Sequence, residues 1–111
     1  MDLLQVSGGR PLGGTVRVEG AKNSALPIMA AALAIADSVE LHHIPDLVDV
    51  RTMRALLLAL NADVSPLPDG RLQIHAGDAG GKVAHYDLVR QMRASICVLG
   101  PLLTRFGRAC L

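Results

Sequence analysis

The sequence predicts an α/β protein whose helices are buried against sheets, and three features indicate this class. Short runs alternate apolar with polar residues, which is the period of a half-buried strand. Longer segments between them carry apolar residues at helical spacing or at nearly every position, as in helices surrounded by protein. Half of the residues are hydrophobic, and with one Tyr, one Phe and no Trp the apolar content is mostly short and aliphatic, which suits helices packed on strands.

Residues 4–6 and 15–19 open the chain with two alternating runs. Residues 7–14 between them contain four glycines and a proline, which is the composition of a turn. The sequence therefore predicts an opening hairpin.

The period changes after Gly20, and residues 25–36 form an uninterrupted apolar run. Ser24 is suited to cap a helix, and Pro27 is tolerated in a first turn because the amide that it lacks would have no partner there. We expect a helix that is apolar on all sides and therefore buried. The run is shorter than the roughly 20 residues that a membrane-spanning helix needs.

Residues 39–44 predict a short strand, and residues 47–60 predict a second helix. The apolar positions of this helix follow three-and-four spacing, and Asn61 is expected to end it in a left-handed conformation. The apolar stripe consists of Val50, Met53, Leu57 and Leu60.

Residues 64–66 and 72–74 flank the turn 67–70 and predict a second hairpin. Pro66 cannot donate a hydrogen bond to a neighbouring strand, so its strand is expected at the edge of a sheet.

A third helix is expected from Asp87, a favourable N-cap, to Arg105. The pair Gly100-Pro101 should kink it near the middle. A new strand is expected over residues 108–111.

The apolar surface of the predicted helices exceeds what these short strands can cover. Residues 13–16 read Gly-Gly-Thr-Val and residues 80–83 read Gly-Gly-Lys-Val, each before a helix, which hints at a repeated strand–helix unit. An isolated domain of this length would expose an apolar patch of more than a few hundred Å². A larger chain or an obligate partner would account for that surface.

The composition argues against several classes of function. A formal net charge of +1 gives no basic field for nucleic acid, and the aromatic residues that stack on single strands are nearly absent. No export signal opens the chain, and no membrane partner is expected. Cys97 and Cys110 lack metal-ligand spacing and predict reduced thiols in a cytoplasm.

The four histidines and Cys110 offer no catalytic or metal site. His42 and His43 are neighbours on a strand, so their side chains point to opposite faces, and His75 and His85 have no matching ligands nearby in the sequence. Cys110 has no activating histidine in view and is rejected as a nucleophile.

Lys22 and Asn23 form the most informative pair, because they lie where a strand leads into the N-terminus of a buried helix. A helix N-terminus offers free amides and a partial positive charge. A lysine at that end makes sense if a phosphate or carboxylate joins the two positive features, and Asn23 could bind a sugar hydroxyl. On spacing alone, a solvated lysine and a helix-capping asparagine are the favoured interpretation.

Arg90 and Arg93 lie three residues apart and are expected on one face of the third helix. Arg93 enters an otherwise apolar stretch, so it needs a partner. A bound anion is one candidate, and an ion pair with an acidic residue elsewhere is the favoured one.

Motifs along the chain resemble the enolpyruvyl transferase family, and within it the transferases that act on UDP-N-acetylglucosamine. The resemblance covers essentially the whole chain. Because long motifs in one order are specific, it favours the anion-binding interpretation of Lys22 and Asn23. The matching motifs are Gly20-Ala21-Lys22-Asn23-Ser24-Ala25-Leu26-Pro27, Leu47-Val48-Asp49-Val50, Tyr86-Asp87-Leu88-Val89, Met92-Arg93-Ala94-Ser95-Ile96 and the run 99–107.

The resemblance implies an inside-out α/β barrel, in which helices are buried inside sheets and strand–helix units repeat in two lobes. Residues 1–21 would be an opening hairpin that belongs to the second lobe, and residues 22–111 an incomplete first lobe. The active site would lie in the cleft between the lobes, so the remainder of the chain is needed to complete the fold.

The implied reaction transfers the enolpyruvyl group of phosphoenolpyruvate to the 3-hydroxyl of UDP-N-acetylglucosamine and releases phosphate, as the first committed step of peptidoglycan synthesis. By the same resemblance, Lys22 and Asn23 would bind phosphoenolpyruvate and Arg93 would bind UDP-N-acetylglucosamine. Fixed cations would offset the repulsion between two anionic substrates. No metal or organic cofactor is implied.

Two departures from the family pattern matter. Asn61 stands where the family usually has glycine. The reactive cysteine of the family lies on a Pro-Gly-Gly-Cys loop that would follow Leu111, and Cys110 does not match that motif. The 111 residues by themselves are therefore predicted to have no catalytic cysteine and no transferase activity.

Two alternatives remain open. The first is the related synthase of 5-enolpyruvylshikimate 3-phosphate, which typically has Ser-Lys-Ser in place of Ala21-Lys22-Asn23 and Gly-Thr in place of Ala94-Ser95. The second is a non-catalytic nucleotide-sugar-binding module, because a fold does not fix a function.

Overall fold

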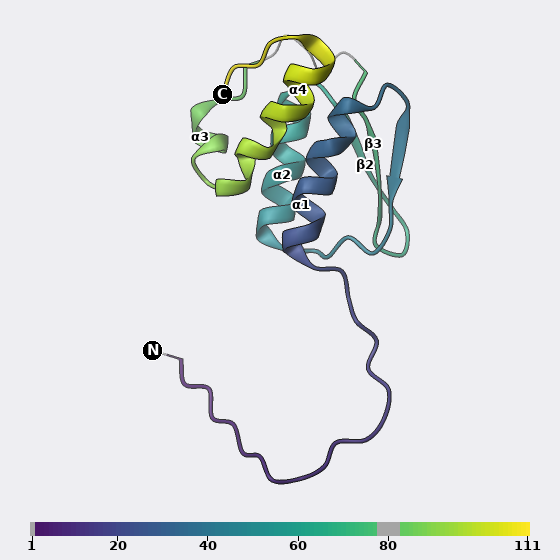
Figure 1. The fold of residues 1–111 in the computed structure, drawn as a ribbon, viewed down its shortest axis with the longest axis vertical. Coiled ribbons are helices and arrows are strands. Elements are labelled where there is room, and N and C mark those ends of the chain that lie inside the picture. The colour runs from purple at the N-terminus through teal and green to yellow at the C-terminus, as the bar shows by residue number, and fades with distance from the viewer. Residues whose placement is uncertain (1, 78–82) are drawn as a thin grey trace.

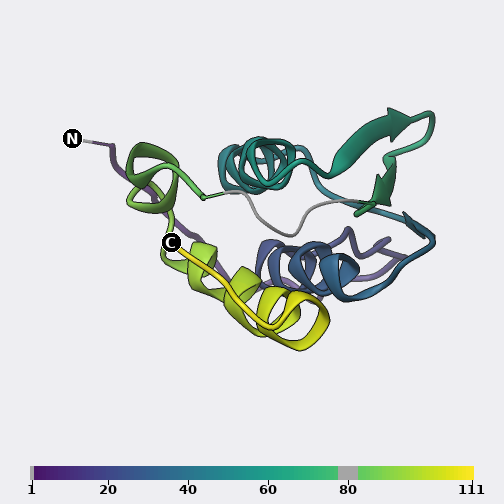
Figure 2. The ribbon, with the colours of Figure 1, turned by 90° about the horizontal axis from the view of Figure 1, so that it is seen from above.

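The computed structural model describes residues 2–77 and 83–111, in which helices pack against a three-stranded sheet (Figure 1). In chain order the elements are α1 (Lys22–Ala31), the 3₁₀ helix η1 (Ala32–Ala34), β1 (Ser38–Leu41), α2 (Val48–Ala59), β2 (Asp63–Leu67), β3 (Arg71–His75), α3 (Tyr86–Val89), the 3₁₀ helix η2 (Arg93–Val98) and α4 (Leu99–Phe106). Helices α1 and α4 lie side by side, and α2 lies across from them next to the hairpin β2–β3 (Figure 2). The α/β class predicted from the sequence is confirmed.

The sheet has the order β1-β3-β2, and both pairs of strands are antiparallel. Ile74 of the central strand pairs with Val39 on one side and with Val64 on the other. The alternation therefore places apolar side chains on the face that packs against the helices. Pro66 lies on the edge strand β2, as predicted.

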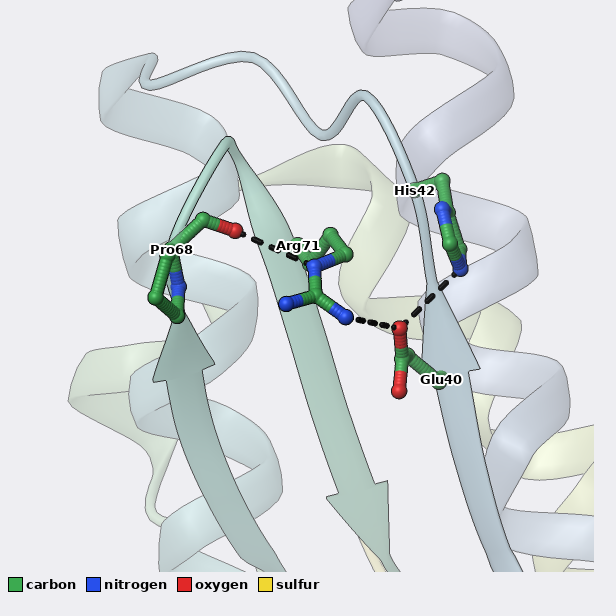
Figure 3. A network of polar contacts seen from close by, with 4 residues as sticks. All are labelled: Glu40, His42, Pro68 and Arg71. Carbon is green, nitrogen blue, oxygen red and sulfur yellow. Dashed lines mark hydrogen bonds and ion pairs between the residues drawn. The ribbon is translucent and has the colours of Figure 1, made fainter.

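A small polar network ties the sheet edge to the hairpin turn (Figure 3). Arg71 donates from Nη1 to Oε1 of Glu40 at 2.8 Å and from Nε to the Pro68 carbonyl at 3.2 Å. His42 Nε2 lies 3.1 Å from the same Glu40 oxygen. His42 thus has a surface role, and the described residues contain no cluster of His, Cys, Asp and Glu that could hold a metal.

Helix α1 begins earlier than predicted, so Ser24 and Pro27, which were expected at its start, lie inside the helix. Ala21 is the N-cap, so the prediction that Ser24 caps the helix is wrong; Ser24 donates from Oγ to the Ala21 carbonyl at 3.0 Å instead. Pro27 consequently lies in the second turn rather than the first, where the amide that it lacks leaves one carbonyl of the helix without its usual donor.

The predicted all-round burial of the first helix is only half correct. The face of α1 with Leu26 and Met29 is buried, but Ile28 is half exposed. The helix also ends at Ala31 and continues as the single turn η1. A helix that is apolar all round needs cover on every side, and the described residues cover one side.

Helix α2 follows its prediction closely. The whole predicted stripe is buried, and Asn61 has a φ of 71°, the left-handed conformation expected at the end of the helix. The buried stripe residues are Val50, Met53, Leu57 and Leu60.

The prediction of one long third helix kinked at its middle is wrong. The segment is divided into α3, η2 and α4, and the chain is extended at Met92, with φ −147° and ψ 124°. His85 rather than Asp87 is the residue before the first turn. Pro101 is the third residue of α4, where a missing amide costs no helical hydrogen bond, so the break falls before the proline.

The predicted strand 108–111 is also wrong, since no strand forms there. One hydrogen bond, from the Ala84 amide to the Cys110 carbonyl at 3.4 Å, joins this end of the chain to the segment before α3. Gly107 ends α4 with a φ of 71° and donates to the Leu103 carbonyl at 2.9 Å.

Residues 2–20 contain no strand, so the predicted opening hairpin does not form in this structure. Figure 1 shows this segment extending away from the helices and the sheet. Its apolar side chains are exposed, with Leu12 at 100% and Val18 at 90%. A two-stranded hairpin is marginal in water unless a further strand or a helix covers its apolar face, and no described residue provides that cover.

Arg105 connects three distant segments of the core. Its Nη1 donates to the carbonyls of Leu33 and Ile35 at 3.1 Å each, and its Nη2 donates to the Gly77 carbonyl at 3.0 Å. The planar fork of arginine suits several acceptors at once. It thereby fastens α4 to the end of η1 and to the chain that leaves β3.

The repeat suggested by residues 13–16 and 80–83 stays a prediction, because residues 80–82 lie outside the described residues. Within residues 2–77 and 83–111, no helix has the length and apolar character needed to cross a membrane.

Candidate functional site

The start of α1 is fixed by a close contact between Gly20 and the turn after β1. A Cβ added at Gly20 would collide with the carbonyl oxygen of His43 and would lie 3.3 Å from Cδ of Pro45. His43 is itself left-handed, with a φ of 56°. The glycine therefore lets the chain pass against this turn, which leads into α2, and so brings the first turns of α1 and α2 together.

A pocket of about 300 Å³ lies between the start of α1, the start of α2 and the chain that enters η2. It contains Lys22, Asn23 and Arg93, three of the residues that the sequence singled out, and Arg93 lies about 70 positions after the other two. Its lining residues are Lys22, Asn23, Leu26, Asp49, Gln91, Met92, Arg93 and Ala94.

Lys22 is the first residue of α1, and its side chain is ion-paired rather than simply solvated. Nζ lies 2.8 Å from Oδ2 of Asp49, with the two side chains 45% and 34% exposed. Asp49 belongs to the first turn of α2, where the partial positive charge of the helix N-terminus favours a carboxylate. The first turns of two neighbouring helices thus meet through this pair.

Asn23 does not cap α1, because the N-cap is Ala21 and no side chain caps the helix. The interpretation of Asn23 as a cap is therefore wrong. Asn23 is the second residue of the helix and lines the pocket. The first amides of a helix have no partner within it, so the uncapped terminus leaves donors at the pocket.

Arg93 is exposed and begins η2, and no ion pair of Arg93 occurs among the residues that the structure describes. The favoured expectation of an acidic partner is thus not met there. Arg90 instead pairs with Asp87 at 3.3 Å, and its guanidinium lies 5.7 Å from the centre of the Tyr86 ring.

The prediction that Arg90 and Arg93 share one helix face is wrong, because the extended residue Met92 interrupts the helix between them. Both arginines still line a neighbouring pocket of about 440 Å³. Only Arg93 also lines the pocket that contains Lys22.

Asp49 and Gln91 are the site residues that the sequence did not reveal. Asp49 stands in one of the matching motifs, but an acidic residue in the first turn of a helix is common, so nothing marked it as a site residue until α1 and α2 were placed side by side. Gln91 lies in the break before η2, which the prediction of one continuous helix concealed.

The charges of the pocket favour an anionic ligand. Lys22 and Arg93 supply two cations against the single carboxylate of Asp49, and the uncapped α1 terminus adds a partial positive charge. Asn23 and Gln91 offer amide donors and acceptors that suit hydroxyl groups. Such an arrangement can hold a phosphate or carboxylate beside a polyol.

The described residues that line this pocket include no thiol. Cys110 is exposed and Cys97 is partly buried against the core, and both are free thiols outside the lining. The lining among the described residues therefore supplies binding groups and one carboxylate.

Comparison with known families gives one match that covers nearly the whole chain. The model of the family described as EPSP synthase (3-phosphoshikimate 1-carboxyvinyltransferase) matches residues 6–110.

Curated relatives are similar at the sequence level. A protein of Campylobacter hominis is 44% identical over 107 residues and one of Sorangium cellulosum is 48% identical over 109 residues; both are named UDP-N-acetylglucosamine 1-carboxyvinyltransferase. The alignments cover 96% and 98% of this chain but 26% of each relative. The chain thus spans about a quarter of the length of these relatives.

A solved structure with the same arrangement is the enolpyruvyl transferase NikO from Streptomyces tendae. It matches with a TM-score of 0.72 and 28% sequence identity, over 90% of this chain and 23% of that one.

Proposed function

Because this chain belongs to the EPSP synthase family of enolpyruvyl transferases, we propose that it forms part of an enzyme that transfers the enolpyruvyl group of phosphoenolpyruvate to the 3-hydroxyl of UDP-N-acetylglucosamine. Phosphate is the second product. The names of the relatives support this acceptor, since each of the four is a UDP-N-acetylglucosamine 1-carboxyvinyltransferase. The reaction would serve the first committed step of peptidoglycan synthesis in the cytoplasm.

The observation that carries the proposal is the convergence of Lys22, Asn23 and Arg93 on one pocket. Lys22 would bind the phosphate of phosphoenolpyruvate, with Asn23 beside it, and Arg93 would bind the nucleotide sugar. Two anionic substrates repel each other, so cations fixed on helices lower the free energy of bringing them together. The uncapped start of α1 adds amide donors on the same side.

The proposal extends to the organisation of the enzyme. Residues 1–21 would pair within a second lobe and residues 22–111 would form part of the first, with the reaction in the cleft between them. The exposed apolar side chains of residues 2–20 and the quarter-length match to the relatives support this division. The reactive cysteine would then lie in sequence beyond Leu111, and the 111 residues alone would have no transferase activity.

The test is to express the reading frame with whatever sequence follows Leu111 and to measure phosphate release from phosphoenolpyruvate. Turnover with UDP-N-acetylglucosamine as acceptor is expected, and a stronger response to shikimate 3-phosphate would contradict the acceptor assignment. Binding of the nucleotide sugar without turnover would instead favour a non-catalytic module.

The variant Lys22→Met tests the site itself. Loss of a fixed cation at a transferring phosphate is expected to lower kcat/KM by about 10²-fold. Arg51→Met, which removes a cation from an exposed ion pair outside the pocket, is the matched control and should retain activity. Unchanged turnover and donor affinity in Lys22→Met would reject the role proposed for Lys22.

A further inference from the structure

The carboxylate that faces Lys22 lies in the proposed substrate pocket but has no part in the function described so far. Asp49 Oδ2 is 2.8 Å from Nζ of Lys22, and both residues line the pocket. Building on the proposed function, we propose that Asp49 is a positioning residue: it holds the Lys22 ammonium in the pocket, where it meets the phosphate of the donor.

The place of Lys22 explains why it needs such a partner. It is the first residue of α1, where the partial positive charge of the helix repels an ammonium group. Its four-carbon side chain is flexible, so without a partner it would turn toward solvent and away from the helix end. Asp49 is the one acidic residue in the lining that the structure describes, and it sits in the first turn of α2, which favours its negative charge.

The ion pair is compatible with a bound phosphate. An ammonium group has three donors, and the contact with Asp49 occupies one, which leaves two for an anion. Arg93 and the uncapped start of α1 supply further positive charge on the same pocket. The donor would therefore meet an excess of positive charge even with Asp49 in place, and Lys22 would bridge the carboxylate and the phosphate.

The ion pair between Asp49 and Lys22 is not needed to stabilise the fold. The two side chains are partly exposed, and ion pairs of that kind contribute little to folding stability because water screens them. Removal of Asp49 should therefore leave the unfolding transition nearly unchanged. The effect is expected in donor binding, which separates positioning from stabilisation.

The experiment uses the complete protein with the variants Asp49→Ala and Asp49→Asn. Asp49→Ala is expected to raise the KM for phosphoenolpyruvate and the Kd for inorganic phosphate, measured by calorimetry, by about tenfold because the ammonium is no longer held in place. Asp49→Asn retains an oxygen acceptor and should recover to within about threefold of the wild type. The kcat at saturating donor should change less than the KM.

Two controls show whether Asp49 acts through Lys22. Asp46→Ala removes a carboxylate from an exposed pair with Arg51 outside the pocket and should leave the KM unchanged. In a Lys22→Met background, Asp49→Ala should have no further effect. An undiminished effect in that background, or donor and phosphate binding that stays equal or becomes tighter in Asp49→Ala, would overturn the inference.

The two levels of the proposal fail separately. A wild-type protein that binds phosphate but does not turn over the two substrates would reject the proposed function, and the phosphate titration would still decide the role of Asp49. A wild-type protein that turns over normally while Asp49→Ala behaves identically would reject only the role of Asp49. A wild-type protein that binds no phosphate would overturn the inference as well.

Discussion

Strand β3 and residues 15–19 have the same alternation of apolar and polar residues but opposite fates. In β3, Leu72 and Ile74 are buried between two neighbouring strands and the helices. In residues 15–19, Val16 and Val18 are exposed and form no strand. The pattern is equally clear in both segments, so the pattern alone does not decide the outcome.

The difference shows that alternation specifies which side chains can share a face, whereas burial depends on what covers that face. Each fully buried Val, Leu or Ile contributes about 1.5–3 kcal/mol relative to an exposed one. β3 obtains this contribution from its neighbouring strands and from the hydrophobic core that it shares with the helices. Residues 15–19 find no such cover among the described residues, so nothing offsets the entropy lost in ordering them.

The largest effect is expected from shortening Ile74 of β3, compared with the same kind of change at Val18. Ile74→Ala, at a site with no exposed surface, should lower the free energy of unfolding of the 111-residue chain by about 2–5 kcal/mol because it removes contacts and leaves a cavity. Val18→Ala should change it by less than about 0.5 kcal/mol. Urea unfolding followed by circular dichroism measures both.

The same pair of variants in a longer protein would sharpen the comparison. If residues 1–21 pair within a second lobe, Val18→Ala should become destabilising there. Equal losses from Ile74→Ala and Val18→Ala in the 111-residue chain would contradict the exposed state of residues 15–19.

An intermediate effect is expected at Gly20, where the exposed segment meets the folded body. Gly20→Ala would place a methyl group against the His43 carbonyl, and the strain should destabilise the chain by about 1–3 kcal/mol. Gly13→Ala is the matched control, because an added Cβ meets nothing within 4 Å. A shift in the urea midpoint for Gly13→Ala as large as for Gly20→Ala would argue against this boundary.

The smallest effect is expected from the ion pair between Asp46, which follows Pro45, and Arg51 of α2. Arg51 donates to both carboxylate oxygens of Asp46 at 2.7 Å, and this hydrogen bonding lowers the pKa of Asp46 below its ordinary value of 3.8. Both side chains are exposed, so water screens most of the interaction.

The pH dependence of that pair follows from the direction of the shift. A carboxyl whose pKa is lower in the folded state contributes stability above its ordinary pKa, and the contribution is lost as the pH falls through the lowered value. The melting temperature of Asp46→Asn should be slightly below that of the wild type at neutral pH, and the gap should close in acid. A gap that stays constant in acid would show that the charge of Asp46 has no part in it.

Much of the folded part after Gly20 could be predicted, because the sequence features that specify it are local. The buried stripe of α2, the left-handed Asn61 and the edge position of Pro66 each follow from the spacing or chemistry of neighbouring residues. The predictions of the opening hairpin and of the strand 108–111 were wrong because each element needs a neighbouring strand or helix that the described residues do not provide. The prediction of one long third helix was wrong because the backbone of Met92 is extended, and no local sequence feature marks this break.

The candidate site likewise contains residues that could be identified from the sequence and residues that could not. Lys22, Asn23 and Arg93 were identified from motifs, and the structure brings them to one pocket. Asp49 and Gln91 were missed because their importance depends on contacts between segments far apart in the sequence. The contact of Gly20 with His43 was missed for the same reason, since a glycine before a helix has many possible causes.

The three hydrogen bonds of Arg105 also bear on how the chain reaches this structure. They close loops of 72, 70 and 28 residues, and closing loops of that length costs chain entropy before the contacts can form. We expect α4 to dock late in folding and the Arg105 guanidinium to hold it in place. Loss of the Arg105 contacts would leave three carbonyls without their donor at once, so α4 should open as one cooperative unit rather than fray from its end.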